Sequence, residues 1–335
     1  MATIRGIAKL AGVAPSTVSV ALNGGGRIAT TTRTRILRIA RSKDYRPNQI
    51  ARSLRSRHTR TIGLLVPSIA NPFYPAVARG AEDAAFASGY EVLLCNSDRD
   101  EAKEQRYVAA LRDKWVDAMI FAAPMVHSSV LRDLASDGVR VVSMNRAVGH
   151  DGACEIWIDY KSAAKLAVEH LVSLGHTHIG FIGSSLQLRR FRDRFEGYKE
   201  VLTQHGCFRQ DLVTIGGYDE EAGYALGAML LSAKSRPTAL FCANDVMAIG
   251  AMGAIVDEGL CIPEDLSIVG FDDIPFASVM RPKLTTVHQP SYEVGRIAVE
   301  LALGIAQHVH RRGRRYVLPT QLVVRDSSGP VRVQK

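Results

Sequence analysis

The strongest constraint on the fold is an alternation that begins at Thr61 and continues through the rest of the chain. Short apolar runs of four to six residues are separated by longer amphipathic stretches. Such runs are typical of strands buried on both faces, and the stretches between them are typical of helices. The runs are Ile62–Val66, Tyr90–Cys95, Ala118–Ala122, Val139–Met144, Ile179–Ile182, Ala239–Cys242 and Ile268–Phe271. The alternation predicts an α/β body of doubly wound parallel sheets with helices on both faces.

The body from Thr61 to Lys335 is long enough for two such lobes, and the composition of the chain suits them. Of the 335 residues, 47% are hydrophobic and 22% are charged, which excludes a disordered chain. No apolar run approaches the roughly 20 residues of a membrane helix, and the amino terminus lacks the hydrophobic stretch of a signal peptide. The five cysteines are odd in number and widely spaced, which favours free thiols. We therefore expect a cytoplasmic protein with no membrane partner.

Charge divides the chain into two unlike parts. Residues 1–60 contain 13 Lys and Arg but a single acid, Asp44, whereas the remaining 275 residues contain 29 basic and 32 acidic side chains. A cationic head on a mildly acidic body indicates that the head alone binds a polyanion. Charge by itself leaves open the alternative of a basic surface that is merely solvated.

The head is predicted to contain three short helices. Residues 4–11 place apolar side chains on one stripe, with Thr3 as the N-cap and Gly12 as the left-handed stop. Pro15 suits the first position of a second helix, which runs to Leu22, and a third is expected from about Thr31 to Lys43. The third helix should show basic residues outside, namely Arg33, Arg35, Arg38 and Arg41. This pattern is typical of a helix-turn-helix unit, and although a generic three-helix core would share it, the outer basic charge favours DNA binding.

Short motifs in a fixed order extend this interpretation over nearly the whole chain. In the head they are the run from Thr3 to Asn23, then Tyr45-Arg-Pro-Asn48 and Ile50-Ala-Arg-Ser-Leu-Arg55. In the body they are Gly63-Leu-Leu-Val-Pro67, Asn71-Pro-Phe-Tyr74, Ala167-Val-Glu-His-Leu171, Gly175-His176, Ala243-Asn-Asp245, Pro263-Glu-Asp-Leu266, Gly270-Phe-Asp-Asp273 and Leu284-Thr-Thr286. Together and in this order, the motifs resemble those of the lac repressor/gal repressor (LacI/GalR) family of transcriptional regulators.

The resemblance implies three domains. Residues 1–46 would form the helix-turn-helix DNA-binding domain, and residues 47–60 the hinge helix and linker. Residues 61–335 would form a periplasmic-binding-protein-like domain of two lobes that binds the effector and dimerises. Lobe 1 would comprise about 61–159 and 290–318, and lobe 2 about 160–289 and 319–330, because in the family the chain crosses between the lobes three times.

The resemblance also places the helix from Pro15 to Leu22 in the major groove as the recognition helix. The residues expected to contact DNA are Arg5, Pro15, Ser16, Thr17, Ser19, Val20, Asn23, Tyr45, Asn48, Arg52, Leu54 and Arg55. Val20 departs from the arginine common in the family. Valine cannot form a bidentate contact with guanine and offers only an apolar surface to a thymine methyl, so Ser16, Thr17 and Arg5 should carry more of the readout.

A leucine of the family's hinge helix inserts into the minor groove at the operator centre, and Leu54 occupies the matching position. Asn48 can cap this helix, and Arg52 and Arg55 flank the leucine where they can reach phosphates. The helix is too short to be stable alone and would form only on DNA beside a partner chain. Ordinary packing of Leu54 against the body is the alternative.

Effector contacts are expected at the carboxyl ends of the parallel strands, in the crevice between the lobes. Most of the candidates directly follow predicted strands, whereas Arg194 and Tyr218 come from the resemblance. The set is Ser68, Asn71, Phe73, Tyr74, Asn145, Arg146, Arg194, Tyr218, Asn244 and Asp272. Charged forks, amides and aromatic rings of this kind suit a sugar or a nucleobase. Alternatively, Asn145, Asn244 and Asp272 cap helices.

These observations predict a DNA-binding transcriptional regulator, most simply a repressor, that binds a palindromic operator as a homodimer. A small effector, expected to be a sugar, would control it. No cofactor, metal site or catalytic residue is expected, because dinucleotide, P-loop and nucleophile-elbow motifs are absent from the sequence. The alternatives are a solute-binding module for a sugar or purine without a DNA role, which the basic head contradicts, and a regulator that needs a purine co-repressor.

Three further expectations concern the body. Dimer contacts should come from the helix Ala76–Ser88 and from the helix after His288-Gln-Pro290, and the polar carboxyl terminus favours a dimer over a tetramer. The basic run Arg311-Arg-Gly-Arg-Arg315 is interpreted as a solvated loop ahead of a strand at Gln321–Val324. Tyr160 stands where the family more often has Asn, which leaves the geometry of the first crossing in doubt.

Overall fold

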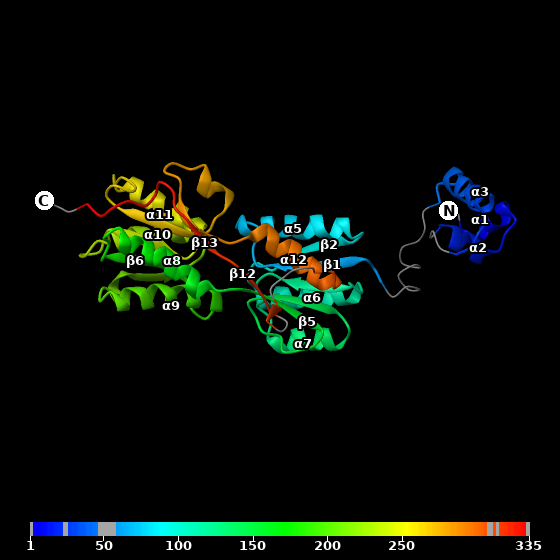
Figure 1. Ribbon diagram of the computed structural model, residues 1–335, viewed down its shortest axis with the longest axis horizontal. Coiled ribbons are helices and arrows are strands. Elements are labelled where there is room, and N and C mark those ends of the chain that lie inside the picture. Colours follow the sequence, from blue (N-terminus) through cyan, green and yellow to red (C-terminus); the bar gives the residue numbers. More distant parts are fainter. Residues whose placement is uncertain (1–2, 23–25, 46–57, 307–310, 313–314, 333–335) are drawn as a thin grey trace. The chain divides into compact units, whose positions relative to one another are not determined.

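A computed structural model describes residues 3–22, 26–45, 58–306, 311–312 and 315–332 (Figure 1). The chain divides into two compact units, Met1–Thr59 and Arg60–Lys335. The first is a small helical head and the second is an α/β body, which confirms the fold class predicted from the sequence. Among the described residues, no helix is long and apolar enough to cross a membrane.

The head consists of α1 (Ile4–Ala11), α2 (Pro15–Leu22) and α3 (Thr30–Ser42). Thr3 caps α1 as predicted, because its hydroxyl accepts a hydrogen bond from the Gly6 amide at 3.1 Å. Gly12 ends the helix in the left-handed conformation, with φ of 61°. Small and branched side chains from all three helices form one core, made of Ile7, Ala8, Ala11, Val18, Ala21, Ile36 and Ala40.

Lobe 1 of the body is built on a seven-stranded sheet in the order β11-β12-β5-β4-β3-β1-β2. All its pairings are parallel except that between β11 and β12. The strands are β1 (Thr61–Val66), β2 (Glu91–Asn96), β3 (Ala118–Phe121), β4 (Arg140–Met144), β5 (Ala153–Ile158), β11 (Arg311–Arg312) and β12 (Arg315–Leu318). The helices of this lobe are α5 (Phe73–Ala87), α6 (Glu101–Asp113), α7 (Ser128–Ser136) and α12 (Ser291–Leu303).

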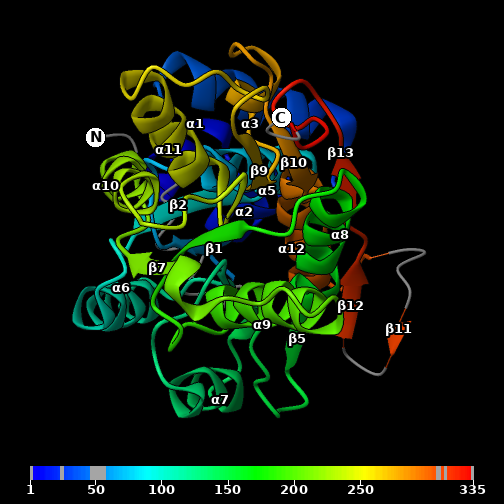
Figure 2. The same cartoon turned by 90° about the vertical axis from the view of Figure 1, so that its left-hand side faces the viewer.

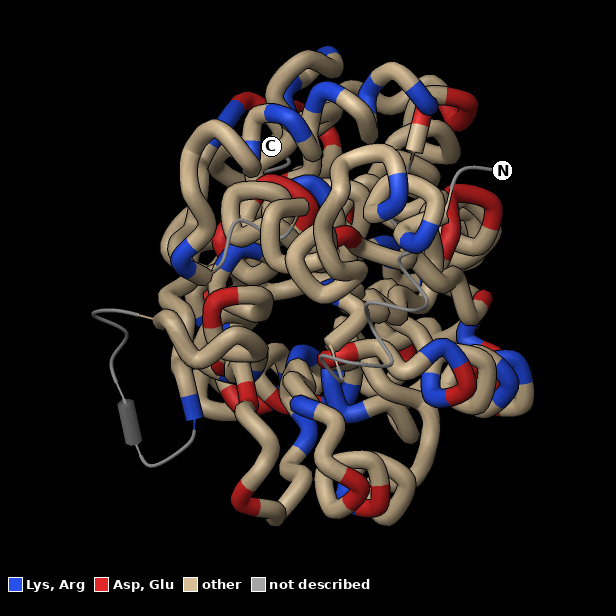
Figure 3. The backbone as a smooth tube through the Cα atoms, turned by 90° about the vertical axis from the view of Figure 1, so that its right-hand side faces the viewer, with Lys and Arg blue, Asp and Glu red and all other residues tan. Residues whose placement is uncertain are grey.

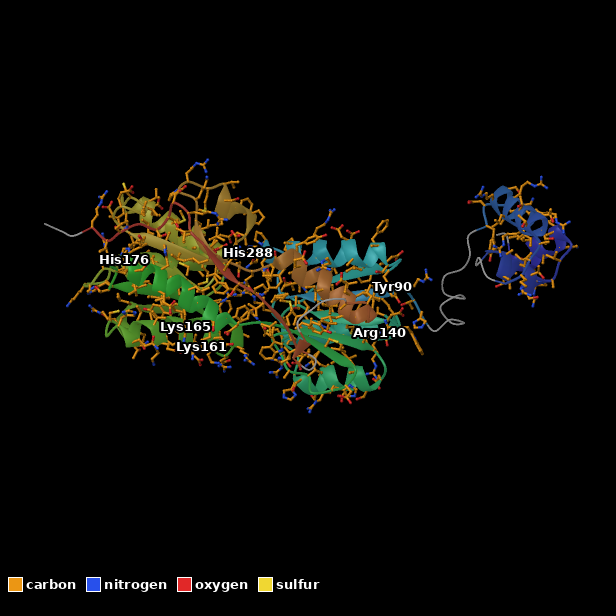
Figure 4. The ribbon with its side chains drawn as sticks, viewed as in Figure 1. Tyr90, Arg140, Lys161, Lys165, His176 and His288 are labelled. Atoms are coloured by element: carbon orange, nitrogen blue, oxygen red, sulfur yellow. The ribbon has the colours of Figure 1, made fainter. Side chains whose placement is uncertain are left out.

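Lobe 2 is built on a six-stranded sheet in the order β13-β10-β9-β8-β6-β7, in which only β13 runs antiparallel to its neighbour. The strands are β6 (Ile179–Ser184), β7 (Val213–Gly216), β8 (Ala239–Cys242), β9 (Ser267–Asp272), β10 (Thr285–His288) and β13 (Gln321–Val323). The helices are α8 (Tyr160–Ser173), α9 (Arg189–Gln204), α10 (Glu220–Leu231) and α11 (Asp245–Asp257). Figure 2 shows α8 and α9 side by side. Lys161 and Lys165 of α8, labelled in Figure 4, both pair with Glu200 of α9.

The chain passes between the two sheets three times, after β5, after β10 and between β12 and β13. As a result, α12 lies beside α5 in lobe 1 although more than 200 residues separate them in sequence (Figure 1). The approach is so close that a Cβ atom on Gly80 of α5 would lie 2.0 Å from the Tyr292 carbonyl oxygen of α12. Distant parts of the sequence are therefore connected in two ways, by the segments that pass between the sheets and by the packing of α5 against α12.

The structure corrects the interpretation of the basic run near the carboxyl terminus. Arg311–Arg312 and Arg315–Leu318 form strands β11 and β12 rather than a loop, and β12 pairs in parallel with β5. Glu155 of β5 accepts a hydrogen bond from the Arg315 guanidinium at 2.9 Å, which provides the counter-charge that the sequence did not reveal.

Candidate functional site

The outer surface of the head carries much of the predicted DNA-contacting set. Arg5, Pro15 and Ser16 are exposed, and Thr17 and Ser19 are half-buried. The basic side chains of α3 also point outward at Arg35, Arg38 and Arg41, whereas Arg33 is half-buried and donates to the Gly26 carbonyl at 3.5 Å. In the body, by contrast, basic and acidic positions are interspersed along the chain (Figure 3).

Two of the predicted DNA contacts are more enclosed than the sequence implied. Val20 is half-buried and lies against the turn after α2, where a Cβ atom on Gly26 would come within 2.6 Å of its Cγ1. Tyr45 is half-buried against the core of the head, and its amide donates to the Ala40 carbonyl at 2.9 Å. Apolar packing therefore takes part of the surface that each residue could offer to DNA. The remaining predicted contacts, Asn23, Asn48, Arg52, Leu54 and Arg55, lie outside the described residues.

An ion pair between Arg194 and Asp272 lies at the centre of the candidate effector site. Arg194 comes from α9 and Asp272 ends β9, and their side chains are only 4% and 6% exposed. The Arg194 Nη2 donates to Asp272 Oδ1 at 3.3 Å, and Nη1 donates to the Ala243 carbonyl. The Arg194 guanidinium also lies over the ring of Phe271, 3.8 Å from its centre. The Arg194 guanidinium is thus held between a carboxylate and the face of an aromatic ring.

The backbone at the end of β9 directs two adjacent carboxylates to different partners. Asp272 and Asp273 both have positive φ, of 123° and 58°, which is uncommon for residues other than glycine and marks functional sites. Asp272 faces the cleft, where its carboxylate also accepts a hydrogen bond from the side-chain amide of Gln289. Asp273 instead accepts from Arg325 at 2.7 Å and contacts His288, labelled in Figure 4, at 2.9 Å. Asp273 therefore joins the end of β10 to the segment that follows β13.

The environment sets the acidity of these two groups in opposite directions. Burial raises the pKa of Asp272 to about 6, against the opposing effects of Arg194, Gln289 and Asn71. Burial would also raise the pKa of Asp273, but hydrogen bonds from His288 and Arg325 outweigh it and lower that pKa. Asp272 is consequently a carboxylate whose charge depends on its neighbours in the cleft.

Lobe 1 closes the cleft with residues around the start of α5. Asn71, Phe73 and Tyr74 are buried and line the same small cavity as Arg194 and Asp272. The Asn71 side chain accepts from the Phe73 amide at 2.9 Å, and the rings of Phe73 and Tyr74 meet edge to face with centres 5.1 Å apart. Ser68, also predicted from this loop, does not line the cavity, and its hydroxyl accepts from the Ala70 amide at 3.3 Å.

Of the other predicted effector contacts, some line a cavity and some form hydrogen bonds within the protein. Asn244 caps α11, because its Oδ1 accepts from the Met247 amide at 2.7 Å, although it also lines the cavity. Tyr218 lies beneath the Arg99 guanidinium. Asn145 does not cap a helix: its Oδ1 accepts from the Ile158 amide of β5 at 2.7 Å. Arg146 donates to the Val126 carbonyl at 2.6 Å, and it lines with Asn145 a second cavity beside the first.

Five cavity residues were missed by the sequence reasoning: Arg99, Tyr160, Arg190, Phe191 and Gln289. Arg99 follows the carboxyl end of β2, just as Asn71 follows that of β1. The search for polar side chains after strands could therefore have identified it. Arg190 lies one helical turn before Arg194 and shares its face. Gln289 could not be found, because it follows β10, whose Thr285-Thr-Val-His288 sequence lacks an apolar run. Tyr160 is 6% exposed and its ring lies under the Arg194 guanidinium, with 4.7 Å between them.

Comparison with known proteins agrees with both parts of this architecture. Residues 3–48 match the model for bacterial regulatory proteins of the lacI family, and residues 168–328 match a periplasmic binding protein-like domain. The ribose operon repressor of Halalkalibacterium halodurans is 36% identical, with 98% of this chain and 97% of the relative covered. The HTH-type transcriptional regulator GalR of Escherichia coli (strain K12) is 35% identical, with coverages of 92% and 90%.

Solved structures agree as well. The lac repressor dimer bound to operator and the anti-inducer ONPF superposes with a TM-score of 0.85 and 25% identity, covering 98% of this chain and 99% of that one. A LacI family regulator from Enterococcus faecium with bound ribose gives a TM-score of 0.72 and 30% identity, covering 81% and 100%. The head and body together define a DNA-binding transcriptional regulator. The chain belongs to the LacI/GalR family.

Proposed function

We propose that the protein represses transcription from a palindromic operator as a homodimer, and that a sugar-type effector bound in the cleft controls its affinity for DNA. The observation that carries the proposal is the buried Arg194–Asp272 pair, which lines a cavity together with Asn71 and Tyr74 of the other lobe. A polyhydroxylated ring can bind the charged pair through its hydroxyls and stack on the aromatic rings. The ribose-related relatives support this effector class.

Control of DNA binding follows from the position of the cavity between the lobes. Asn71 and Tyr74 belong to lobe 1, whereas Arg194 and Asp272 belong to lobe 2, so a ligand that contacts all four favours the closed arrangement. A ligand shifts the equilibrium between two arrangements only by its difference in affinity for them. The same mechanism therefore serves induction or co-repression, depending on which arrangement binds the operator.

Dimerisation is part of the proposal because one small head reads only a half-site, and two heads on a two-fold axis read a palindrome. We assign the contacts in lobe 1 to α5 and α12, as predicted from the sequence. Phe86 at the end of α5 is 80% exposed, and Tyr292 of α12 is 40% exposed. Large apolar side chains exposed at these positions suit burial by a second copy. Action on chromosomal DNA places the protein in the cytoplasm.

The proposal is tested by selecting double-stranded DNA from a random library with the full-length protein. The expected outcome is enrichment of a palindrome whose half-sites lie about one helical turn apart. A variant carrying Ser16→Glu and Thr17→Glu should lose the selected site and keep its unfolding midpoint, because both side chains lie on the outer part of α2. Enrichment of a single non-palindromic half-site would contradict the dimer, and enrichment of no sequence would contradict operator recognition.

A further inference from the structure

The cleft contains more positive charge than its own residues neutralise. Arg99, Arg190 and Arg194 line the central cavity, and Arg146, Arg189 and Arg192 line the neighbouring cavity, which shares Arg190 and Tyr160 with the first. Among the described residues, Asp272 is the only carboxylate that lines either cavity. A site built only for a neutral sugar has no need of this excess.

Arg194 and Asp272 neutralise each other, and Arg189 and Arg192 pair with Asp193 and Glu196 of the same helix. The excess therefore lies on other side chains. In the described part of the chain, Arg99 and Arg190 form no side-chain hydrogen bond or ion pair with another residue. The Nε and Nη1 atoms of Arg99 and the Nη2 atom of Arg190 are buried without a hydrogen-bond partner. Arg194 Nε and the Gln289 Oε1 atom are also buried and unpartnered. The four arginine nitrogens are donors, whereas Gln289 Oε1 is an acceptor. Unsatisfied buried donors are unfavourable, and four of them around one cavity indicate a ligand that accepts hydrogen bonds.

The two free guanidinium groups come from different lobes and lie close enough to repel each other. Arg99 follows β2 in lobe 1 and stacks on Tyr218 of lobe 2, whereas Arg190 lies in the first turn of α9 in lobe 2. Burial and the positive charge of Arg190 together lower the pKa of Arg99 to about 10, against the opposing effects of Tyr74, Tyr218 and Asp272. Arg99 therefore remains charged at neutral pH, and an anion between the two groups would remove the repulsion and join the lobes.

We propose that the natural effector is an anionic sugar derivative whose carboxylate or phosphate binds between Arg99 and Arg190, while its hydroxyls bind Arg194, Asp272 and Gln289. The inference rests on the proposed role of the cleft as the effector site. Arginine forks bind carboxylates and phosphates through paired hydrogen bonds. A neutral sugar would satisfy Arg194 and Gln289 but would leave Arg99 and Arg190 with only the charge of Asp272, which already pairs with Arg194.

The test compares matched ligands on the full-length protein by thermal shift and calorimetry. One set is ribose, ribonate and ribose 5-phosphate, a second is glucose, gluconate and glucose 6-phosphate, and inorganic phosphate alone is compared with chloride at equal ionic strength. We expect an acidic member to bind at least tenfold more tightly than its neutral parent, and phosphate alone to raise the unfolding midpoint. Preference for ribonate and gluconate would assign a carboxylate, and preference for the sugar phosphates a phosphate.

Variants of the two arginines test whether the anionic group binds between them. Arg99→Gln and Arg190→Gln should each lower affinity for the acidic ligand and for inorganic phosphate at least tenfold. They should not lower the unfolding midpoint without ligand, because each removes one of two positive charges that repel each other. Arg209→Gln is the matched control, since Arg209 pairs with Asp211 away from both cavities and its loss should leave ligand binding unchanged.

Three results would overturn the inference: a neutral sugar that binds as tightly as its acid, silence from every acid and from phosphate, or acid binding that survives in both variants. The comparison of neutral and acidic ligands on the unmodified protein stands even if a variant fails to fold. Binding of the selected operator is measured on the same preparations. A neutral sugar that alters operator binding would refute the anionic effector and leave the proposed function intact.

Discussion

Two buried aspartates of lobe 2, Asp245 and Asp272, differ in whether the polar groups around them all have hydrogen-bond partners. Asp245 begins α11 and is fully buried, and its two oxygens accept from the Thr286 hydroxyl and from the Ile274 amide at 2.9 Å. Asp272 accepts from Arg194 and Gln289, but both of these partners keep a buried polar atom unbonded. The complete network has a structural role, whereas the incomplete one has capacity for a ligand.

The largest effect is expected from filling the space that accommodates Asp245. A Cβ atom on Gly270 would lie 2.2 Å from Asp245 Oδ1, and the buried carboxylate has no room to move. Gly270→Ala should therefore lower the free energy of unfolding by about 3 kcal/mol in urea titrations. Gly253→Ala is the matched control, because its nearest neighbour is a Tyr224 ring atom at 3.4 Å, and it should cost little or nothing. Equal losses in the two variants would contradict the tight packing at Asp245.

A smaller effect is expected from removing the Asp245 charge, and its sign depends on pH. Burial raises the pKa of Asp245 to about 7, so the folded chain holds a proton that the unfolded chain releases near pH 4. This carboxyl therefore makes the protein less stable as the pH rises from about 4 to about 7, with no further change above. Asp245→Asn should flatten this dependence between about pH 4 and pH 7 in denaturant titrations.

The control for this variant is Asp211→Asn on the surface. Its pairing with Arg209 lowers the pKa of Asp211, so its loss should change the pH dependence slightly and in the opposite direction. Phosphate binding should be the same in Asp245→Asn and in the unmodified protein. A loss of phosphate binding would show that the two networks act as one and would remove the distinction between them.

The smallest effect concerns a contact between the lobes at Trp157, beside the second cavity that Arg189 also lines. The Trp157 ring of β5 lies between Arg189 of lobe 2 and Arg315 of lobe 1, with guanidinium carbons 4.4 and 4.5 Å from the ring centre. Trp115, the only other tryptophan, is 77% exposed. In a Trp115→Phe protein, ligands that bind the cleft should change the Trp157 emission. Arg189→Gln should weaken this change, and an emission that does not respond to saturating ligand would show that this contact stays fixed.

The sequence predicted the elements of this fold where local signals were strong. Thr3, Gly12 and Pro15 set the boundaries of the head helices, and the seven apolar runs correspond to seven strands. Strands β5, β7, β10, β11 and β12 were not predicted, because polar or charged residues interrupt or replace the apolar run in each of them. Glu155 in β5 is an example, and its counter-charge is Arg315, 160 residues later.

Within the site, the sequence identified residue types better than their roles. It selected Arg194 and Asp272, but it left open whether Asn145, Asn244 and Asp272 bind ligand or cap helices, and the structure assigns capping to Asn244 alone. The charge excess at Arg99 and Arg190 was not visible. Whether an arginine is neutralised depends on which carboxylates the fold brings near it, and sequence spacing does not contain that information.

The three crossings between the sheets also determine when each lobe can be finished during synthesis. Helix α12 packs against β3 and β4 of lobe 1, yet it follows all of lobe 2 except β13 in the chain. The part of the first sheet that α12 covers, over β3 and β4, therefore stays uncovered until residue 303 has left the ribosome. The head can fold as soon as it emerges, but neither lobe is complete before the last 35 residues. A ribosome that stalls late in the message would consequently release a chain that has a folded DNA-reading head and an unfinished body.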